Sequence, residues 1–463
     1  TGHSDLGDIL LMPTVGELKL NPGTAQQPDG GYRSRYTHDT EVARPGYYEV
    51  ALADYGIKAQ LTTTKRVGVH KYTYPKQSKE QHLVLDLIHG LYNYDGKVLW
   101  TQLRVENDTL VTGYRITNGW ARANYTYFAM SFSKPIKQYG CQEKAKVNYR
   151  GGYSKFDMTR NFPDMGGRKL VAYFDFDPQA GESLEVKVAL SGVSTAGALM
   201  NLQAEASSAS FDQLAEQAAN NWEQALGILD AQGSEDQLAM LYTSLYHTMI
   251  NPCVYMDVDG QYRGLDNNIH RAEGFTNYTV FSVWDTYRAL PPLFIIINRQ
   301  VNTDIAQSML RHCAQSVHHA LPIWSHMANE NWCMIGYHSV SVLADAIAKG
   351  EWLRSPRVQR ERWLSDVGVC LRRLDHLSNR LAGGRSTNGG SLQAACRELP
   401  EGVRHLAWLR TSAPCEWPVQ RSLQPAEHTR RGIHRGQRPQ LFVLCTSGCE
   451  RSDAPDGRRE TLC

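Results

Sequence analysis

The sequence has no run of about 18 or more consecutive apolar residues, so we expect no helix that spans a membrane. It starts at Thr1 instead of Met, and no leader with a charged and then an apolar segment follows, so we expect no signal peptide in this chain. Either a leader has been removed or the start of the chain is missing. No two cysteines form a C-x2-C pair, since Cys445 and Cys449 are four residues apart and have no matching second half. Structural zinc sites usually show two such pairs, so the sequence argues against bound zinc.

Three residue types are missing from the last part of the chain. Residues 351–463 contain no Lys, no Tyr and no Met, although the whole sequence has 23 Tyr and 11 Met. A uniform composition would place roughly seven Tyr in a stretch of this length. The same stretch holds 19 Arg and six of the ten Cys, and its net charge is +7 against −5 for residues 1–350.

A basic tail of this kind often binds nucleic acid. Here the Arg residues are scattered, without Lys or interleaved aromatic residues, so we expect no nucleic-acid partner. Residues 351–463 also show no sustained hydrophobic period, which predicts an irregular or disordered segment.

The chain as a whole is globular in composition, with 42% hydrophobic and 21% charged residues, and its length favours two or three domains. Three segments before residue 205 alternate apolar and polar residues on either side of a turn, which is typical of β-hairpins. They are Tyr47–Tyr74 with a turn at Asp54–Gly56, Lys97–Trp120 with a turn at Asn107–Asp108, and Lys169–Ser194 with a turn at Pro178–Gly181. Such hairpins predict an antiparallel β-sandwich over residues 1–205.

Helical spacing of apolar residues replaces this alternation near residue 205. The expected helices are Phe211–Asp230 with Ser210 as N-cap, Glu235–Cys253, Asp304–Val317 and Met334–Gly350. No strand signal separates them, so we expect an all-α second region. The boundary is placed at residue 205, give or take about four residues. The predicted parts are therefore residues 1–205, 206–350 and 351–463.

The stretch "VFSVWDTYRALPPLF" (Val280–Phe294) combines an apolar setting with Trp284, Asp285 and Arg288. Residues three apart share a helix face, so Asp285 and Arg288 can pair or converge on one ligand. A sugar site needs this chemistry, because a carboxylate accepts from vicinal hydroxyls, Arg donates to oxygens and Trp stacks on a pyranose ring. The alternative is an ion pair between helices beside a core Trp.

Two further stretches are candidates for a site. The loop "LPIWSHMANENWCMIGYH" (Leu321–His338) gathers polar and aromatic residues between two helices: Trp324, His326, Asn329, Glu330, Asn331, Trp332 and His338. An ordinary interhelical loop is the alternative. The amino-terminal Gly2, His3, Ser4 and Asp5 precede the first strand, and here a frayed terminus is the alternative.

The order of these stretches, with "RYTHDTEVARPGYYEVAL" (Arg35–Leu52) and "GYRITNGW" (Gly113–Trp120) between them, resembles glycoside hydrolase family 92. The resemblance covers residues 1 to about 350. It implies a calcium-dependent, inverting exo-α-mannosidase that resembles α-1,2-mannosidases. The implied substrates are α-mannosides of N-glycans or mannan, and the implied location is periplasmic or extracellular. The implied architecture is a β-sandwich packed on an α/α barrel, with residues 206–350 forming linker helices and the first part of that barrel.

The resemblance assigns sugar binding to the Asp and Arg of the WDT-type motif, to polar residues before C-M-I-G-Y-H and to the amino-terminal loop. The matching residues are Trp284, Asp285, Arg288, Asn329, Glu330, Gly2 and His3. Family members usually have His-Pro where Pro291-Pro292 stands, and two adjacent prolines predict a helix start or break.

Catalysis by inversion needs two carboxyl groups about 6.5–9.5 Å apart, one acting as acid and one as base. The family's acid lies in an E-G-N-A-W type motif, its base in a G-N-D-D type motif before Q-M-S-A-W, and its Ca²⁺ ligands partly in N-E-P. Residues 351–463 contain none of these, so we assign no catalytic residue and no metal ligand and expect no activity. Glu330 lies in a loop where the sequence shows no apolar pocket that would raise its pKa.

A change of reading frame near codon 350 would explain both the missing motifs and the altered composition. A shifted frame through GC-rich DNA yields Arg, Ser, Pro, Cys, Leu and Gly and loses Lys, Tyr, Ile and Met. A genuinely different carboxy-terminal segment is the alternative, because a random frame usually meets a stop codon sooner. The sequence therefore predicts an inactive copy of an exo-α-mannosidase, and a non-catalytic carbohydrate-binding protein is the alternative.

Overall fold

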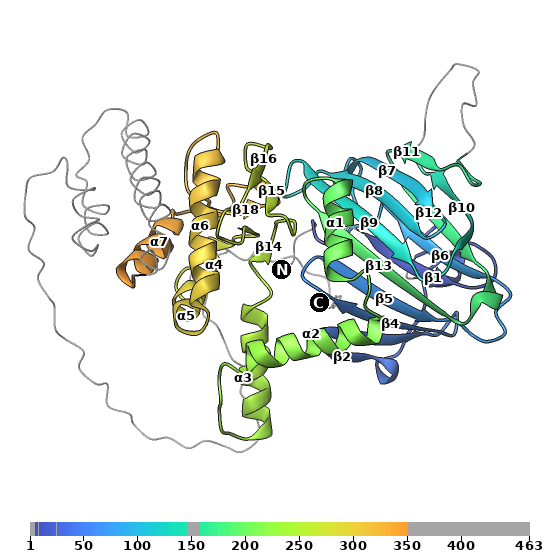
Figure 1. Cartoon of the computed structure of the whole chain (residues 1–463), viewed down its shortest axis with the longest axis horizontal. Helices are drawn as coiled ribbons and strands as arrows, with labels where there is room; N and C mark the ends of the chain where they lie inside the picture. The colour runs from blue at the N-terminus through green and yellow to red at the C-terminus, as the bar shows by residue number, and fades with distance from the viewer. Residues whose placement is uncertain (1–4, 8, 25, 146–157, 351–463) are drawn as a thin grey trace, which may run out of the picture. The chain divides into compact units, whose positions relative to one another are not determined.

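The structure is a computed structural model that describes residues 5–7, 9–24, 26–145 and 158–350. The expected irregular segment 351–463 and the candidate residues Gly2 and His3 lie outside the described residues. The described part is an antiparallel β-sandwich followed by helices, so the predicted fold class is confirmed (Figure 1).

The sandwich consists of a four-stranded sheet in the order β1-β6-β12-β10 and a nine-stranded sheet in the order β11-β7-β8-β9-β13-β5-β4-β3-β2. The first sheet contains β1 (Leu10–Thr14), β6 (Gln81–Asp86), β10 (Ile136–Glu143) and β12 (Leu170–Phe176). The second contains β2 (Val42–Arg44), β3 (Tyr47–Leu52), β4 (Ile57–Thr63), β5 (Val67–Thr73), β7 (Val98–Asn107), β8 (Leu110–Thr117), β9 (Asn124–Phe132), β11 (Asp164–Gly167) and β13 (Ser183–Ser191). All neighbouring strands in the two sheets pair antiparallel.

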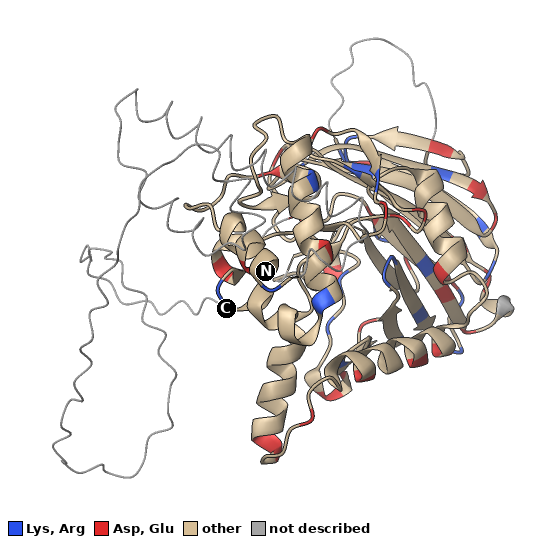
Figure 2. Ribbon diagram, turned by 60° about the vertical axis from the view of Figure 1, so that its left-hand side comes forward, with Lys and Arg blue, Asp and Glu red and all other residues tan. Residues whose placement is uncertain are grey.

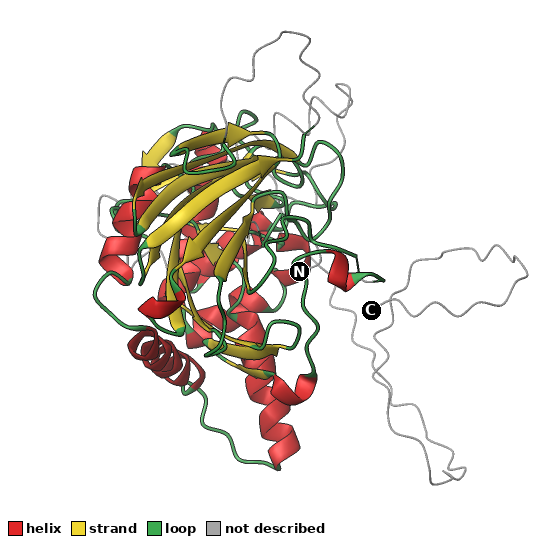
Figure 3. Cartoon of the chain, turned by 90° about the vertical axis from the view of Figure 1, so that its right-hand side faces the viewer, coloured by secondary structure: helices red, strands yellow, loops and turns green. Residues whose placement is uncertain are grey.

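One hydrophobic core joins the two sheets, which pack face to face (Figure 3). Leu83 and Phe174 enter it from the first sheet, and Ile57, Leu103 and Leu184 enter it from the second. All five side chains are fully buried. Side chains that alternate along a strand point to opposite faces, so the apolar alternation seen in the sequence is what fills this layer.

The first two predicted hairpins are confirmed. β3, β4 and β5 form a meander in which Leu52 pairs with Ile57, and β7 pairs with β8 as far as Asn107 and Leu110. The turns therefore fall at Ala53–Gly56 and Asp108–Thr109.

The third predicted hairpin, Lys169–Ser194, is wrong. β12 pairs with β6 and β10, whereas β13 pairs with β5 and β9. The short 3-10 turn Pro178–Ala180 thus carries the chain from one sheet to the other, and the Asp177 carboxylate accepts from the Gln179 N–H at 3.0 Å. Alternation along a segment identifies a strand but not its partner, because both inner faces bury the same kind of side chain.

Helices α1 (Thr195–Glu205), α2 (Phe211–Leu226) and α3 (Glu235–Thr248) follow the sandwich. Ala198 and Leu202 of α1 pack with Val67 and Ala189 of the second sheet. Ser210 caps α2 as predicted, in a capping box with Gln213. Helices α2 and α3 contain Asp and Glu but no Lys or Arg (Figure 2). The domain boundary at residue 205 stays a prediction.

The remaining helices are α4 (Val283–Thr286), α5 (Leu290–Ile297), α6 (Arg299–Gln315) and α7 (Ser339–Ala348). The expectation that no strands separate the helices is wrong, because three two-stranded ribbons occur: β14–β17, β15–β16 and β18–β19. Their strands are Cys253–Val254, Tyr278–Thr279, Gln261–Arg263, Ile269–Arg271, Ser325–His326 and Asn329–Glu330. Strands of two or three residues are too short to show a hydrophobic period.

Helices α5, α6 and α7 share a second core that includes Phe294, Leu310 and Leu343. Pro291 and Pro292 occupy the first turn of α5, so the predicted helix start at these prolines is confirmed. In the described part of the chain, no helix is both long and apolar enough to cross a membrane.

Candidate functional site

The WDTYR stretch divides into a buried anchor and an exposed face. Phe281 and Val283 are 3% and 2% exposed and belong to the helical core, whereas Trp284, Asp285 and Arg288 are exposed. Trp284 is therefore not a core residue, and its indole is 39% exposed. The segment presents an indole, a carboxylate and a guanidinium on the surface while its neighbours hold it in place.

Asp285 and Arg288 do not form the ion pair that their spacing allows, among the contacts of the described residues. The Ser282 hydroxyl donates to the Asp285 carboxylate, and Arg288 Nε donates to the Tyr287 hydroxyl at 2.6 Å. The expectation of a shared helix face is wrong because α4 ends at Thr286, which leaves Arg288 in the turn before α5. The interpretation of this pair as an inter-helix salt bridge is therefore excluded.

His338 joins the WDTYR stretch to the loop Leu321–His338. Its ring stacks on Tyr287 with centroids 4.1 Å apart and an interplanar angle of 11°, and it lies 5.3 Å from the Trp284 ring. The two stretches that the sequence singled out separately thus meet in one cluster. Tyr287 lay within a named motif but was not a candidate residue, because spacing alone does not show ring contacts.

The β18–β19 hairpin forms the middle of the Leu321–His338 loop. Its two turn residues, Met327 and Ala328, have φ values of +43° and +61°, as a tight two-residue hairpin requires. Trp332 and Met334 also have positive φ, at +54° and +71°. A non-glycine residue with positive φ costs about 1–3 kcal/mol in conformational free energy, and residues strained in this way concentrate at functional sites.

Glu330 holds the backbone of this loop. Its carboxylate accepts from the N–H groups of Trp324 at 2.8 Å, Ile323 at 3.0 Å and Trp332 at 3.1 Å. Burial raises the pKa of Glu330, while these N–H groups act in the opposite direction. The expectation that nothing raises this pKa is therefore wrong, because the loop folds over its own carboxylate.

Asn329 donates to two backbone oxygens, one in the turn of the hairpin and one in the sandwich. Its Nδ2 donates to the carbonyl of Met327 at 2.7 Å and to that of Ala123, next to β9 of the sandwich, at 3.3 Å. Asn329 and Glu330 are thus positioned by backbone contacts, and Asn329 connects the hairpin to the sandwich.

Buried polar atoms without a hydrogen-bond partner occur in the same loop. Among the described residues these include Trp324 Nε1, Asn331 Nδ2 and His338 Nε2. Native proteins pair nearly all buried polar groups, so each exception needs an explanation. Three of these atoms therefore lie in the same aromatic loop.

Asp5 brings the amino-terminal stretch to the hairpin. It is fully buried, its Oδ1 lies 2.6 Å from Lys97 Nζ, and its Oδ2 accepts from the Ala121 N–H at 2.7 Å and lies 3.8 Å from His326 Nε2. A frayed terminus is therefore excluded at Asp5. No sequence pattern indicates the role of Lys97, a buried lysine directly before β7.

Trp120, in the connection between β8 and β9, contacts Trp324 of the Leu321–His338 loop. Its ring centroid lies 5.3 Å from that of Trp324. Exposed Trp284 and Trp332, with Asp285 and Arg288, supply stacking faces and charged hydrogen-bonding groups. These are the groups that recognise a sugar ring. Among the described residues, no three or more His, Cys, Asp or Glu side chains gather in a group that could hold a metal ion.

Comparison with family descriptions gives two matches. Residues 1–191 match the glycosyl hydrolase family 92 N-terminal domain, and residues 197–363 match the glycosyl hydrolase family 92 catalytic domain. A comparison with curated protein sequences gives no significant match.

Solved structures give further matches. The family GH92 α-mannosidase BT3965 from Bacteroides thetaiotaomicron is 43% identical, with a TM-score of 0.71 over 78% of this chain and 48% of that chain, and it has also been solved with mannoimidazole. The family GH92 inverting mannosidase BT2199 from the same organism is 28% identical, with a TM-score of 0.64 over 77% of this chain and 44% of that chain. The chain spans about half the length of these structures.

Proposed function

Because the chain belongs to glycosyl hydrolase family 92, we propose that its described residues form the mannose-recognition part of an exo-α-mannosidase. The observation that carries the proposal is the contact of His338 with both Tyr287 and Trp284, which gathers Asp285 and Arg288 beside the aromatic loop. The mannoimidazole complex of BT3965 supports an α-mannoside as the ligand. A periplasmic or extracellular location, implied by the family alone, is part of the same proposal.

Each group has a distinct task in this proposal. Asp285 accepts hydrogen bonds from two neighbouring hydroxyls of the terminal mannose, and Arg288 donates to sugar oxygens. Trp284 stacks on the apolar face of the pyranose. Glu330 and Asn329 do not bind the sugar directly in this proposal, because their contacts hold the loop backbone in place.

The chemistry proposed for the family is inversion, in which an acid protonates the leaving oxygen and a base activates water. We propose that this 463-residue chain binds mannosides without hydrolysing them, because residues 351–463 contain none of the acid, base or calcium motifs. Glu330 is the half-buried carboxyl group of the loop, and its desolvation raises its pKa and so favours the protonated form. Both its oxygens already accept backbone N–H groups, so we assign it to positioning and not to acid catalysis.

Calcium enters the proposal only as an expectation from the family. No step of the proposed function is derived through the metal.

Isothermal titration of the full chain with methyl α-mannoside tests the proposal, with methyl α-galactoside as the control sugar. We expect saturable binding of the mannoside, weakened by about tenfold or more in Asp285→Asn, and much weaker binding of the galactoside. Equal binding of the two sugars, or binding that survives Asp285→Asn unchanged, would contradict the assigned site.

A further inference from the structure

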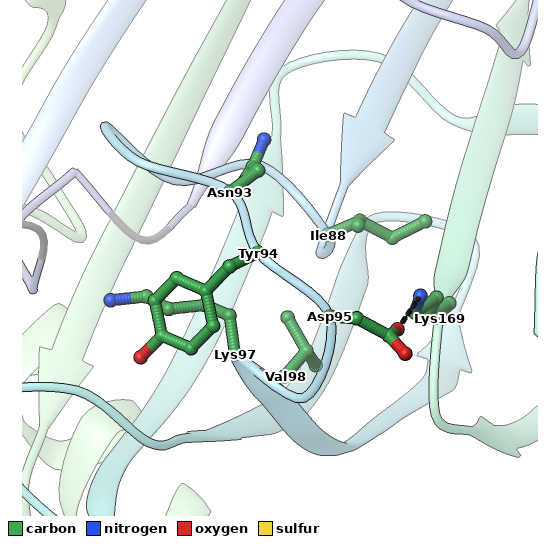
Figure 4. A pocket seen from close by; sticks show the side chains of 7 residues that line it. All are labelled: Ile88, Asn93, Tyr94, Asp95, Lys97, Val98 and Lys169. Carbon is green, nitrogen blue, oxygen red and sulfur yellow. Dashed lines mark hydrogen bonds and ion pairs between the residues drawn. The ribbon is translucent and has the colours of Figure 1, made fainter.

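A pocket of about 240 Å³ lies on the sandwich between the loop that precedes β7 and the turn that precedes β12. The residues that line it are Ile88, Asn93, Tyr94, Asp95, Lys97, Val98 and Lys169 (Figure 4). Sites for drug-sized ligands usually measure about 300–1,000 Å³, so this pocket suits a ligand of a single ring. It is a separate feature from the proposed mannose site, because neither the WDTYR stretch nor the Leu321–His338 loop contributes to this lining.

Each charged group of this lining has a partner of opposite charge. Lys169 Nζ is 3.0 Å from Asp95 Oδ1, and Lys97 Nζ is 2.6 Å from Asp5 Oδ1. The described lining therefore offers no unbalanced charge that an ionic ligand would neutralise. Because binding sites complement the charge of their ligands, a neutral ligand with polar groups fits this pocket better than a phosphate, a carboxylate or a cation.

The side chain of Tyr94 is held in place by two contacts. Its hydroxyl donates to the carbonyl of Asn118, and the Lys97 ammonium lies 5.8 Å from the centroid of its ring. Tyr94 is nevertheless 48% exposed, so the ring is accessible for stacking. A ring that is already fixed loses little conformational entropy when a ligand stacks on it.

The two sides of the pocket differ in their chemistry. In Figure 4 the Tyr94 ring and the Asp95–Lys169 ion pair lie on either side of Val98. The aromatic ring can cover the apolar face of a pyranose, while the ion pair and the Asn93 amide can bind its hydroxyl groups. A sugar ring is a neutral ligand with these two properties.

Exposed apolar side chains provide a second observation at the same segment. They are Leu91, Tyr92, Leu99 and Trp100, which flank the lining residues in the sequence. Apolar side chains that gather on a protein surface mark a site of interaction. The loop before β7 and the start of this strand therefore carry more exposed apolar surface than the fold requires.

We propose that this pocket is a second carbohydrate site, which binds one pyranose ring of a neutral glycan independently of the site at Trp284, Asp285 and Arg288. The inference goes beyond the proposed function, and it requires no glycan to extend from one site to the other. A small pocket that holds one ring binds weakly, so it acts mainly on polymeric glycans that present many such rings.

The experiment measures how strongly soluble α-mannan retards the chain in native gels of increasing mannan content. The full-length Asp285→Asn variant is used, because the mannose site is weakened in it. We expect this variant to be retarded, and the additional substitution Tyr94→Ala to weaken its apparent affinity by about fivefold or more, since the stacking face is lost. Tyr94→Phe in the same background keeps the ring and should retain most of the retardation.

Asn93→Ala is a second variant, because its exposed side chain can be removed without disturbing the core. In the Asp285→Asn background it should weaken the apparent affinity by about two- to tenfold, the usual effect of one lost hydrogen bond. Tyr36→Ala is the matched control, because Tyr36 is 50% exposed and does not line the pocket, and it should leave the retardation unchanged. Thermal unfolding of each variant checks that the fold persists.

Two results would overturn this inference: no retardation of the Asp285→Asn variant, or equal retardation with and without Tyr94→Ala and Asn93→Ala. Both would leave the proposed function standing, because that function is tested by titration with methyl α-mannoside. Retardation that depends on Tyr94, in a chain whose unsubstituted form does not bind methyl α-mannoside, would support the second site and overturn the proposed function alone.

Discussion

At the scale of residues, the imidazole of His338 is where two distant parts of the sequence meet. It stacks on Tyr287 and contacts Trp284, and it thereby fixes the turn that carries Arg288. Arg288 and Asp285 bind different neighbours and not each other, so each presents its charged group separately. The affinity for a sugar should therefore depend on both side chains independently.

Arg288→Ala and Asp285→Asn should each weaken binding of methyl α-mannoside by about tenfold or more. The loss of one hydrogen bond to a charged group costs about 1.5–3 kcal/mol, and each 1.4 kcal/mol is a factor of ten in affinity. Titration calorimetry measures the effect. Asp345→Asn on α7, which loses only a partly exposed ion pair with Lys349, is the control and should bind normally. A similar loss in the control would show that the site has not been located.

Asp257 should make stability depend on pH. Burial raises its pKa, against hydrogen bonds from Ser191 at 2.7 Å and Asn201 at 2.8 Å. A carboxyl group whose pKa is higher in the folded state binds its proton more tightly there, so stability falls as pH rises from the unfolded value, about 3.9, through the raised value.

Asp257→Asn removes this titration. The free energy of unfolding of the variant, relative to the unsubstituted chain, should increase as pH rises through that window, as measured by urea titrations at several pH values. A constant difference across the window would show that the pKa of Asp257 is the same in both states.

At the scale of elements, three sets of contacts hold the β18–β19 hairpin in place. Glu330 binds the backbone on either side of it, Asn329 binds Ala123 of the sandwich, and His326 lies beside Asp5. The buried Asp5–Lys97 pair fixes the amino-terminal stretch at the same place. Removing one partner would leave an uncompensated charge inside the protein.

Asp5→Ala should therefore destabilise the protein by about 3–5 kcal/mol, the usual cost of an orphaned buried charge. The double variant Asp5→Ala/Lys97→Met should be less destabilised than Asp5→Ala alone, because no buried charge remains. Urea unfolding measures both. Gly119→Ala provides a second route to the same defect, since a Cβ there would collide with the Asp5 carboxylate. A double variant that is less stable than Asp5→Ala would refute this account of the pair.

Elements with a half-buried face were predictable from the sequence, because alternation or helical spacing records which side chains point inward. Tyr47–Tyr74 and Phe211–Asp230 are examples. The partner of a strand is not recorded in this way, so β12 and β13 were joined incorrectly. The ribbon strands are too short to carry a period.

The candidate site was only partly predictable for a related reason. Residue types and spacing identified Trp284, Asp285 and Arg288, but the end of α4 at Thr286 depends on backbone contacts that spacing does not show. The environment of Glu330 consists of main-chain N–H groups, which are the same for every residue type. The contact of Asp5 with His326 joins residues far apart in the sequence, and no local pattern predicts it.

At the scale of the whole molecule, the similarity to the family ends in the same region in which the amino-acid composition changes. The family match ends at residue 363, and Lys, Tyr and Met are absent after residue 350. We predict that another reading frame of the coding DNA from about codon 350 encodes the missing carboxylate motifs. Translation of that DNA in all three frames is the measurement. Absence of the motifs from both other frames would favour a genuinely different carboxy-terminal segment.

The most direct measurement of the central claim follows binding and turnover together in the purified 463-residue chain with calcium added. The account predicts saturable binding of methyl α-mannoside that depends on Asp285, and no release of p-nitrophenol from p-nitrophenyl α-mannoside above that of the Asp285→Asn variant. BT3965 serves as the positive control for turnover. Hydrolysis at a rate comparable to BT3965 and abolished by Asp285→Asn would contradict the account, because the acid and base would then lie among the residues assigned here to binding and positioning.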